Sequence, residues 1–98
     1  MKIFSTATDT EITLKLSGCL DTDAAPEFAA ALDNAAGAKT LVIDFSDLEF
    51  IASSGLRALV LAKKHATQTG NAIVLTGMND VVADVFDVTG LKDVFDIR

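Results

Sequence analysis

Residues 50–57 read FIASSGLR, and the rest of the chain is organised around this stretch. A strand-like apolar run ends before it at Phe45, and a helix-like run follows it to about Thr69. Two serines and a glycine therefore fall at the start of a helix, where the first backbone N–H groups have no helical partner. Such a helix start accepts negative charge. Ser53 and Ser54 thus have two interpretations, a cap of the helix or an acceptor of phosphate.

The composition favours one packed domain over residues 1–98. Of 98 residues, 50% are hydrophobic and 22% are charged, so a hydrophobic core is feasible. The net charge of −6 opposes binding to nucleic acid and to anionic membranes, both of which need clustered Lys and Arg. We find neither a signal peptide nor an apolar run long enough to span a membrane, so we expect a cytoplasmic protein. The single cysteine, Cys19, allows no intramolecular disulfide.

Hydrophobic patterns predict eight elements in the order ββαβαβαβ. The predicted strands cover residues 2–7, 11–16, 40–45, 72–76 and 94–97. Three helices lie between them: one capped by Thr22 or Asp23 and running to about residue 36, one capped by Ser53 or Ser54 and ending at Gly70, and one capped by Asn79 and ending at Gly90. This alternation predicts an α/β fold with a mixed, mostly parallel sheet of about five strands and three helices.

The segments between these elements carry further expectations. Residues 17–22 are expected to form a loop, and Ser46–Asp47 to turn the chain. Phe50 is expected to pack inward beside Leu48 and Ile51. Val60 is expected to lie on the buried stripe of the second helix, and Val81 on that of the third helix.

The predicted topology brings three loops to one edge of the sheet. In a parallel sheet the carboxyl ends of the strands meet at the same edge, where ligands of open α/β sheets bind. The loops that leave this edge carry Asp21 and Thr22, Ser53 and Ser54, and residues 77–79. Asp21 and Ser53, far apart in the sequence, are therefore expected to be neighbours in space.

The groups that catalysis would need are missing around Ser53. His65 is the only histidine and lies in mid-helix beside two lysines, so no Ser-His-acid set can be assembled. The glycine-rich phosphate loops and the Cys/His spacing of zinc sites are also missing. Asp44, Asp47 and Glu49 are better explained as turn residues than as a cation site. We therefore expect no enzyme activity, no metal and no cofactor.

Three motifs resemble one known family. The stretch FIASSGL at 50–56 is similar to the signature of STAS domains, in particular those of bacterial anti-sigma factor antagonists. Two weaker matches, LSGCLD at 16–21 and VFDVTGL at 85–91, follow the same order as in that family.

The resemblance implies a switch without catalysis of its own. The unphosphorylated antagonist binds an anti-sigma factor that is also a serine kinase, which frees a sigma factor for transcription. Phosphorylation separates the pair, and a PP2C-type phosphatase restores the active form.

The resemblance also assigns roles to residues of this chain. It makes Ser53 the phosphoacceptor, gives Ser54 and Gly55 the shaping of the helix start, and puts Asp21 on the contact surface. With neighbouring residues of the same edge, the expected partner-binding set is Asp21, Thr22, Ser54, Gly55 and Arg57.

This sequence departs from the family pattern in two ways. Ala52 stands where many members have Asp, which puts in doubt a carboxylate next to the serine. Members usually continue with a further helix after the last strand, so we expect either a short form of the family here or an exposed edge that is covered otherwise, for example by a partner or a second copy. We expect a monomer or a weak dimer. The alternative hypothesis is a constitutively docking STAS subunit of a transporter or signalling complex, in which Ser53 is only a helix cap.

Overall fold

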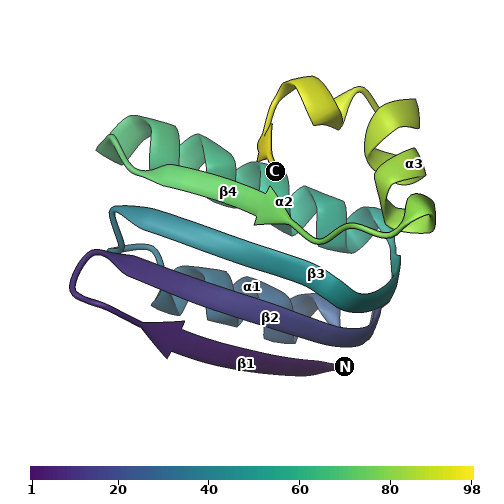
Figure 1. Cartoon of the computed structure of the whole chain (residues 1–98), viewed down its shortest axis with the longest axis horizontal. Helices are drawn as coiled ribbons and strands as arrows, with labels where there is room; N and C mark the ends of the chain where they lie inside the picture. The colour runs from purple at the N-terminus through teal and green to yellow at the C-terminus, as the bar shows by residue number, and fades with distance from the viewer.

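The order of strands in the sheet follows their order in the chain, β1-β2-β3-β4-β5. The computed structural model describes residues 1–98 (Figure 1). The strands are β1 (Lys2–Ala7), β2 (Glu11–Leu20), β3 (Thr40–Ile51), β4 (Ala72–Thr76) and β5 (Asp96–Ile97). The helices are α1 (Ala25–Asn34), α2 (Ser53–Thr69) and α3 (Asp80–Val88), with a short 3-10 turn at Leu91–Asp93. The predicted order ββαβαβαβ is confirmed.

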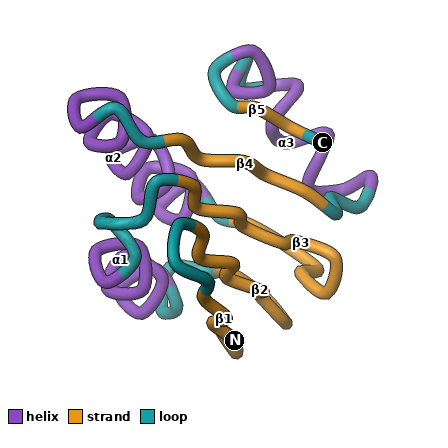
Figure 2. The backbone as a smooth tube through the Cα atoms, turned by 60° about the vertical axis from the view of Figure 1, so that its left-hand side comes forward, coloured by secondary structure: helices purple, strands orange, loops and turns teal.

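The sheet is mixed, as predicted. β1 pairs antiparallel with β2, and every later pair is parallel. A tight hairpin suffices for the antiparallel pair, whereas α1, α2 and α3 make the longer crossovers that parallel strands need. Figure 2 shows α1 and α2 side by side on one face of the sheet. α3 packs against β3 and the 3-10 turn that follows it.

One hydrophobic core lies between the sheet and the helices. It is a single cluster of 20 buried residues, and its largest fully buried side chains include Phe28, Phe45 and Phe86. The rings of Phe45 and Phe86 lie 6.1 Å apart between their centroids, and Phe95 meets Phe86 edge-on at the same distance. These aromatic contacts join α3 and the segment after it to the sheet.

β2 and β3 are longer than predicted: the expected loop at 17–22 begins only after Leu20, and the expected turn at Ser46–Asp47 is wrong. Both strands continue in parallel pairing, from Ser17 opposite Asp47 to Leu20 opposite Ile51. Register shifts interrupt the pairing between Lys15 and Ser17 and again between Gly18 and Cys19. These irregularities let turn-forming residues stay within the strands, and Gly18 adopts a φ of 99° that favours glycine.

The same irregularity changes which side chains are buried. After Phe45 the buried residues of β3 are Leu48 and Ile51, which are three positions apart instead of two. Phe50 is consequently 45% exposed, and the expectation that it packs inward is wrong. Val60 on α2 and Val81 on α3 are likewise exposed, at 37% and 56%, because each lies at the solvent edge of its helix.

Some of the residues that were predicted to begin or end the helices do so in the structure, and others do not. Asn79 caps α3 as predicted, with its Oδ1 accepting from the Val82 N–H at 2.8 Å, and α2 ends at Gly70 with a φ of 76°. The other predicted caps are wrong. Asp21, not Thr22 or Asp23, holds the turn before α1 through its Oδ1, which accepts from the Ala24 N–H at 2.9 Å.

Three further boundaries are corrected. Ala52, not Ser53 or Ser54, is the N-cap residue of α2, and no side chain caps that end. α1 ends at Asn34 and not near residue 36, with its C-cap at Ala35. The last strand is confined to Asp96–Ile97. None of the helices is both long and apolar enough to cross a membrane.

Candidate phosphorylation and partner-binding site

The ends of β2 and β3 bring two of the three predicted loops together. Leu20 and Ile51 are register partners, and the Ala52 N–H donates to the Leu20 carbonyl oxygen at 2.8 Å. Asp21 follows Leu20 directly, and Ser53 lies two residues after Ile51. The two residues therefore leave adjacent strand ends at the carboxyl edge of the sheet, as expected from the topology.

The third predicted loop, residues 77–79, is set back from this edge. β4 is short and pairs with β3 only as far as Thr76 opposite Asp44. Asn79 then reaches β3 through its Nδ2, which donates to the Leu48 carbonyl oxygen at 2.9 Å. The loop thus supports the side of β3. The end of β3 is flanked instead by the segments that carry Asp21 and Ser53.

Ser53 is the first residue of α2, and its side chain is exposed. The first hydrogen bond of the helix runs from the Leu56 N–H to the Ala52 carbonyl oxygen at 3.1 Å. The N–H groups of residues 53–55 precede that bond and give the helix start its partial positive charge. α2 has no acidic residue at all, so nothing within the helix offsets this charge. An anion attached to Ser53 would therefore lie at a favourable helix end.

Ser54 and Gly55 lie behind Ser53. The Ser54 Oγ is buried and has no hydrogen-bond partner. Gly55 is buried, and a Cβ atom at this position would lie 2.7 Å from the Leu20 Cγ and 3.3 Å from the Ile51 Cγ1. Glycine is thus required for α2 to approach the ends of β2 and β3 so closely. We correct our expectation for Gly55 accordingly, because a buried glycine supports the surface without contacting a partner itself.

Asp21, Thr22 and Arg57 lie on the two segments that meet at this edge, and their environments differ. Asp21 is exposed, but its Oδ1 and its carbonyl oxygen both hold the turn before α1. Thr22 is exposed on that turn. Arg57, one turn along α2, is exposed and takes part in none of the three ion pairs of the chain. Its guanidinium group is therefore free to meet an acidic group from outside.

The acidic residues of β3 each have a separate contact. The Asp44 Oδ1 accepts from the Ser46 N–H at 2.9 Å, and Asp47 pairs with Lys15 at 3.4 Å. Glu49 lies 3.9 Å from the Cys19 Sγ. No three His, Cys, Asp or Glu side chains gather in a way that would hold a metal ion.

Comparison with known proteins agrees with the motifs. The family model described as "Mlab, STAS domain" matches residues 3–97, almost the whole chain. The chain belongs to the STAS domain family. Its sequence is 32% identical to BtrV of Bordetella bronchiseptica, named as an anti-sigma factor antagonist, over 72% of this chain and 60% of the relative. It is 31% identical to the anti-sigma-B factor antagonist of Listeria monocytogenes, over 89% of this chain and 78% of the relative.

Solved structures show the same STAS fold. An anti-sigma factor antagonist from Mycobacterium paratuberculosis superposes with a TM-score of 0.82 at 26% identity, over 98% of this chain and 83% of that one. The antagonist SpoIIAA in its unphosphorylated form gives 0.79 at 18% identity, over 99% and 87%. A sulfate transporter family protein from Wolinella succinogenes gives 0.76 at 16% identity, over 91% and 74%. The last two likenesses are of fold alone.

The sequence did not predict that one exposed residue, Phe50, belongs to this edge of the STAS domain. Phe50 is 45% exposed and lies opposite Cys19 in the register of β2 and β3, three residues before Ser53. The signal was present in the spacing of Phe45, Leu48 and Ile51, because apolar residues three apart leave residue 50 on another side of the strand. A large exposed aromatic side chain beside Ser53 is typical of a protein interface.

Proposed function

We propose that this STAS domain is an anti-sigma factor antagonist whose binding is switched by phosphorylation of Ser53. Unphosphorylated, it binds an anti-sigma factor that is also a serine kinase and so frees a sigma factor for transcription. The kinase ends the interaction by phosphorylating Ser53, and a PP2C-type phosphatase reverses the modification. The observation that carries the proposal is the exposed, uncapped Ser53 at the start of α2, in a chain similar to proteins named as anti-sigma factor antagonists.

The local structure supports Ser53 as the acceptor over Ser54. The hydroxyl of Ser53 is exposed and does not cap the helix, so a kinase reaches it without breaking a structural hydrogen bond. The Ser54 Oγ is buried and would have to leave the interior first. This contrast supports the phosphoacceptor role that the family resemblance implies for Ser53.

The proposed partner surface consists of Asp21, Thr22, Phe50, Ser53 and Arg57. It combines an exposed aromatic side chain with charged groups of both signs. Phosphate adds roughly −1.5 to −2 charges at neutral pH. Attached to Ser53, this charge would repel acidic groups of a partner and would have to lose its water if the partner covered the surface. Phosphorylation can therefore block docking without a large rearrangement of the domain.

The test is phosphorylation by anti-sigma factor kinases of the same organism, with ATP and Mg²⁺, followed by intact-mass measurement. We expect the gain of one phosphate, its loss in Ser53→Ala, and its retention in Ser54→Ala, the matched control. A gain that survives Ser53→Ala would assign the switch to another residue. Lack of any gain with every such kinase would overturn the proposal.

The alternative is a constitutively docking STAS subunit of a transporter or signalling complex; the sulfate transporter family protein from Wolinella succinogenes has the same fold. The assumption of this alternative that Ser53 is a helix cap is wrong, because Ala52 holds that position. Ser53→Asp separates the two functions in a binding assay with a co-purified partner. The switch predicts that affinity falls about 100-fold, the effect of a charge in a desolvated interface. A constitutive subunit predicts an unchanged Kd.

A further inference from the structure

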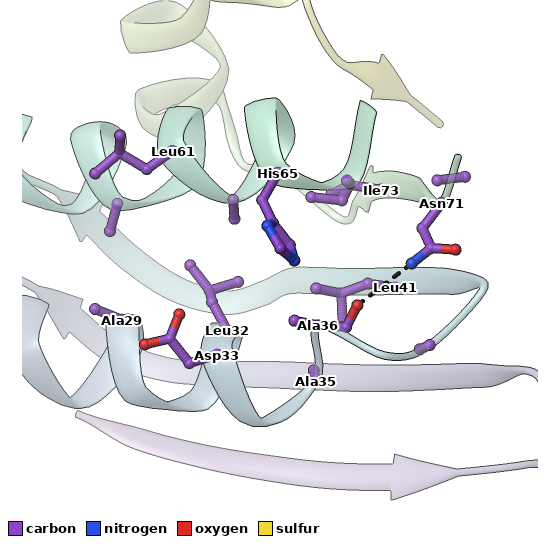
Figure 3. Close-up of a pocket in the computed structure, with 15 residues that line it drawn as sticks. Ala29, Leu32, Asp33, Ala35, Ala36, Leu41, Leu61, His65, Asn71 and Ile73 are labelled. Carbon is purple, nitrogen blue, oxygen red and sulfur yellow. Dashed lines mark hydrogen bonds between the residues drawn. The ribbon is translucent and has the colours of Figure 1, made fainter. Parts of the chain in front are cut away.

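A cavity of about 330 Å³ lies between α1 and α2, at the opposite edge of the sheet from Ser53 (Figure 3). Its floor includes Leu41 and Ile73, which lie near the starts of β3 and β4, whereas Ser53 follows the end of β3. Twelve of its 15 lining residues are hydrophobic. The volume is within the range of about 300–1,000 Å³ that is typical of small-molecule sites. No function proposed above uses this cavity.

The cavity exists because the two helices face each other with short side chains. Ala29 on α1 and Ala36, just after its end, lie across from Ala58 and Ala62 on α2, and none of them reaches far enough to fill the space. Leu61 lines the same wall and is nevertheless 61% exposed. Protein interiors are normally packed without such gaps, so an unfilled apolar space with a large exposed leucine at its rim favours an apolar ligand.

The charges around the cavity indicate whether a charged ligand should be positive or negative. α1 and α2 both end beside it, and neither has a basic residue in its last turn to offset the partial negative charge of a helix C-terminus. Asp33 lies in the last turn of α1 and adds a carboxylate to the lining. His65 points into the cavity from α2, as Figure 3 shows, whereas Lys63 and Lys64 do not line it. This environment favours a cation over an anion.

We propose that the cavity binds a small organic cation with an apolar body, of the class of alkylamines. The apolar body would lie between the alanines of the two helices and against Leu61, and the ammonium group would lie at Asp33. The apolar body of the ligand accounts for the unfilled apolar volume, and its ammonium group accounts for the negative charge beside it. The proposal does not depend on phosphorylation of Ser53, because the cavity lies at the other end of α2.

Titration of the full chain with three probes of equal length tests the proposal. Octylammonium, octanol and octanoate are added separately, and NMR spectra of labelled alanine methyl groups are followed. We expect saturable shifts of the Ala36 and Ala62 methyl groups, strongest with octylammonium, intermediate with octanol and weakest with octanoate. Asp33→Asn should reduce the preference for octylammonium over octanol about fivefold, as expected for a partly exposed ion pair.

Matched variants locate the binding. Ala62→Phe should fill the cavity and abolish the shifts, while Ala30→Phe, at an exposed α1 position outside the cavity, should leave them intact. Ala36→Leu serves as a second filling variant if Ala62→Phe does not fold. Absence of saturable shifts with all three probes, or tighter binding of octanoate than of octylammonium, would overturn the proposal. So would a dimer of the free protein that dissociates on Leu61→Lys, because a second copy would then cover the cavity.

Discussion

The two ends of α2 are packed in opposite ways. At its start, Gly55 lies so close to Leu20 that a single added carbon would be 2.7 Å from the leucine Cγ. Towards its end, alanines leave a cavity of about 330 Å³ next to α1. The packed end fixes the start of α2 against the strand ends, which suits the acceptor role proposed for Ser53. The open end leaves a cavity that no side chain of the protein fills and that a ligand could occupy.

The substitution expected to disturb the packed end most is Gly55→Val. It should lower the free energy of unfolding by about 3 kcal/mol, because the new side chain overlaps Leu20 and Ile51 in a buried place. Urea unfolding followed by circular dichroism measures the change. The matched control is Gly37→Val, where a Cβ atom has no neighbour within 4 Å; its effect should stay within about 0.5 kcal/mol. Equal losses at the two glycines would contradict the contrast in packing.

Two asparagines allow the same comparison for hydrogen bonds. Asn79, toward the carboxyl edge, accepts from the Val82 N–H and donates to the Leu48 carbonyl oxygen, whereas Asn71, beside the cavity, makes one longer bond of 3.3 Å to the Ala36 carbonyl oxygen. Asn79→Ala should therefore cost about 2 kcal/mol of unfolding free energy and Asn71→Ala about 0.5 kcal/mol. The same urea experiment measures both. A greater loss for Asn71→Ala would reverse the ranking of the two edges.

The only gain in stability is expected for Ser54→Ala. Its Oγ is buried without a partner, and alanine also favours the helix, so stability should rise by about 1 kcal/mol. Thermal unfolding measures the gain, with Ser53→Ala as the exposed control that should change little. A loss of stability in Ser54→Ala would mean that the hydroxyl has a bonding partner in solution.

Local signals predicted the elements well where a boundary depends on adjacent residues. The Asn79 cap and the end of α2 at Gly70 are of this kind, because each depends on backbone geometry within one turn. Local signals failed where the pairing between strands determines whether a residue lies in a strand or in a turn. Gly18 and Ser46 favour turns by themselves, but the long pairing of β2 with β3 keeps both within strands.

The site shows the same division. That Asp21 and Ser53 share an edge followed from parallel topology alone. The exposure of Phe50 and the burial of Ser54 could not be predicted in that way, because they depend on a register shift and on the close approach of α2 to Leu20. Which residues reach the surface near Ser53 was therefore decided by contacts between segments distant in the sequence.

The agreement between strand order in the sheet and strand order in the chain has a consequence for synthesis. Each strand pairs with the one made just before it, so no strand has to wait for a partner synthesised much later. Parallel strands usually fold slowly because distant segments must meet, and here each pair is separated by at most one α-helix and a short 3-10 turn. On the ribosome the sheet can therefore grow one strand at a time, and each apolar strand is covered soon after it emerges.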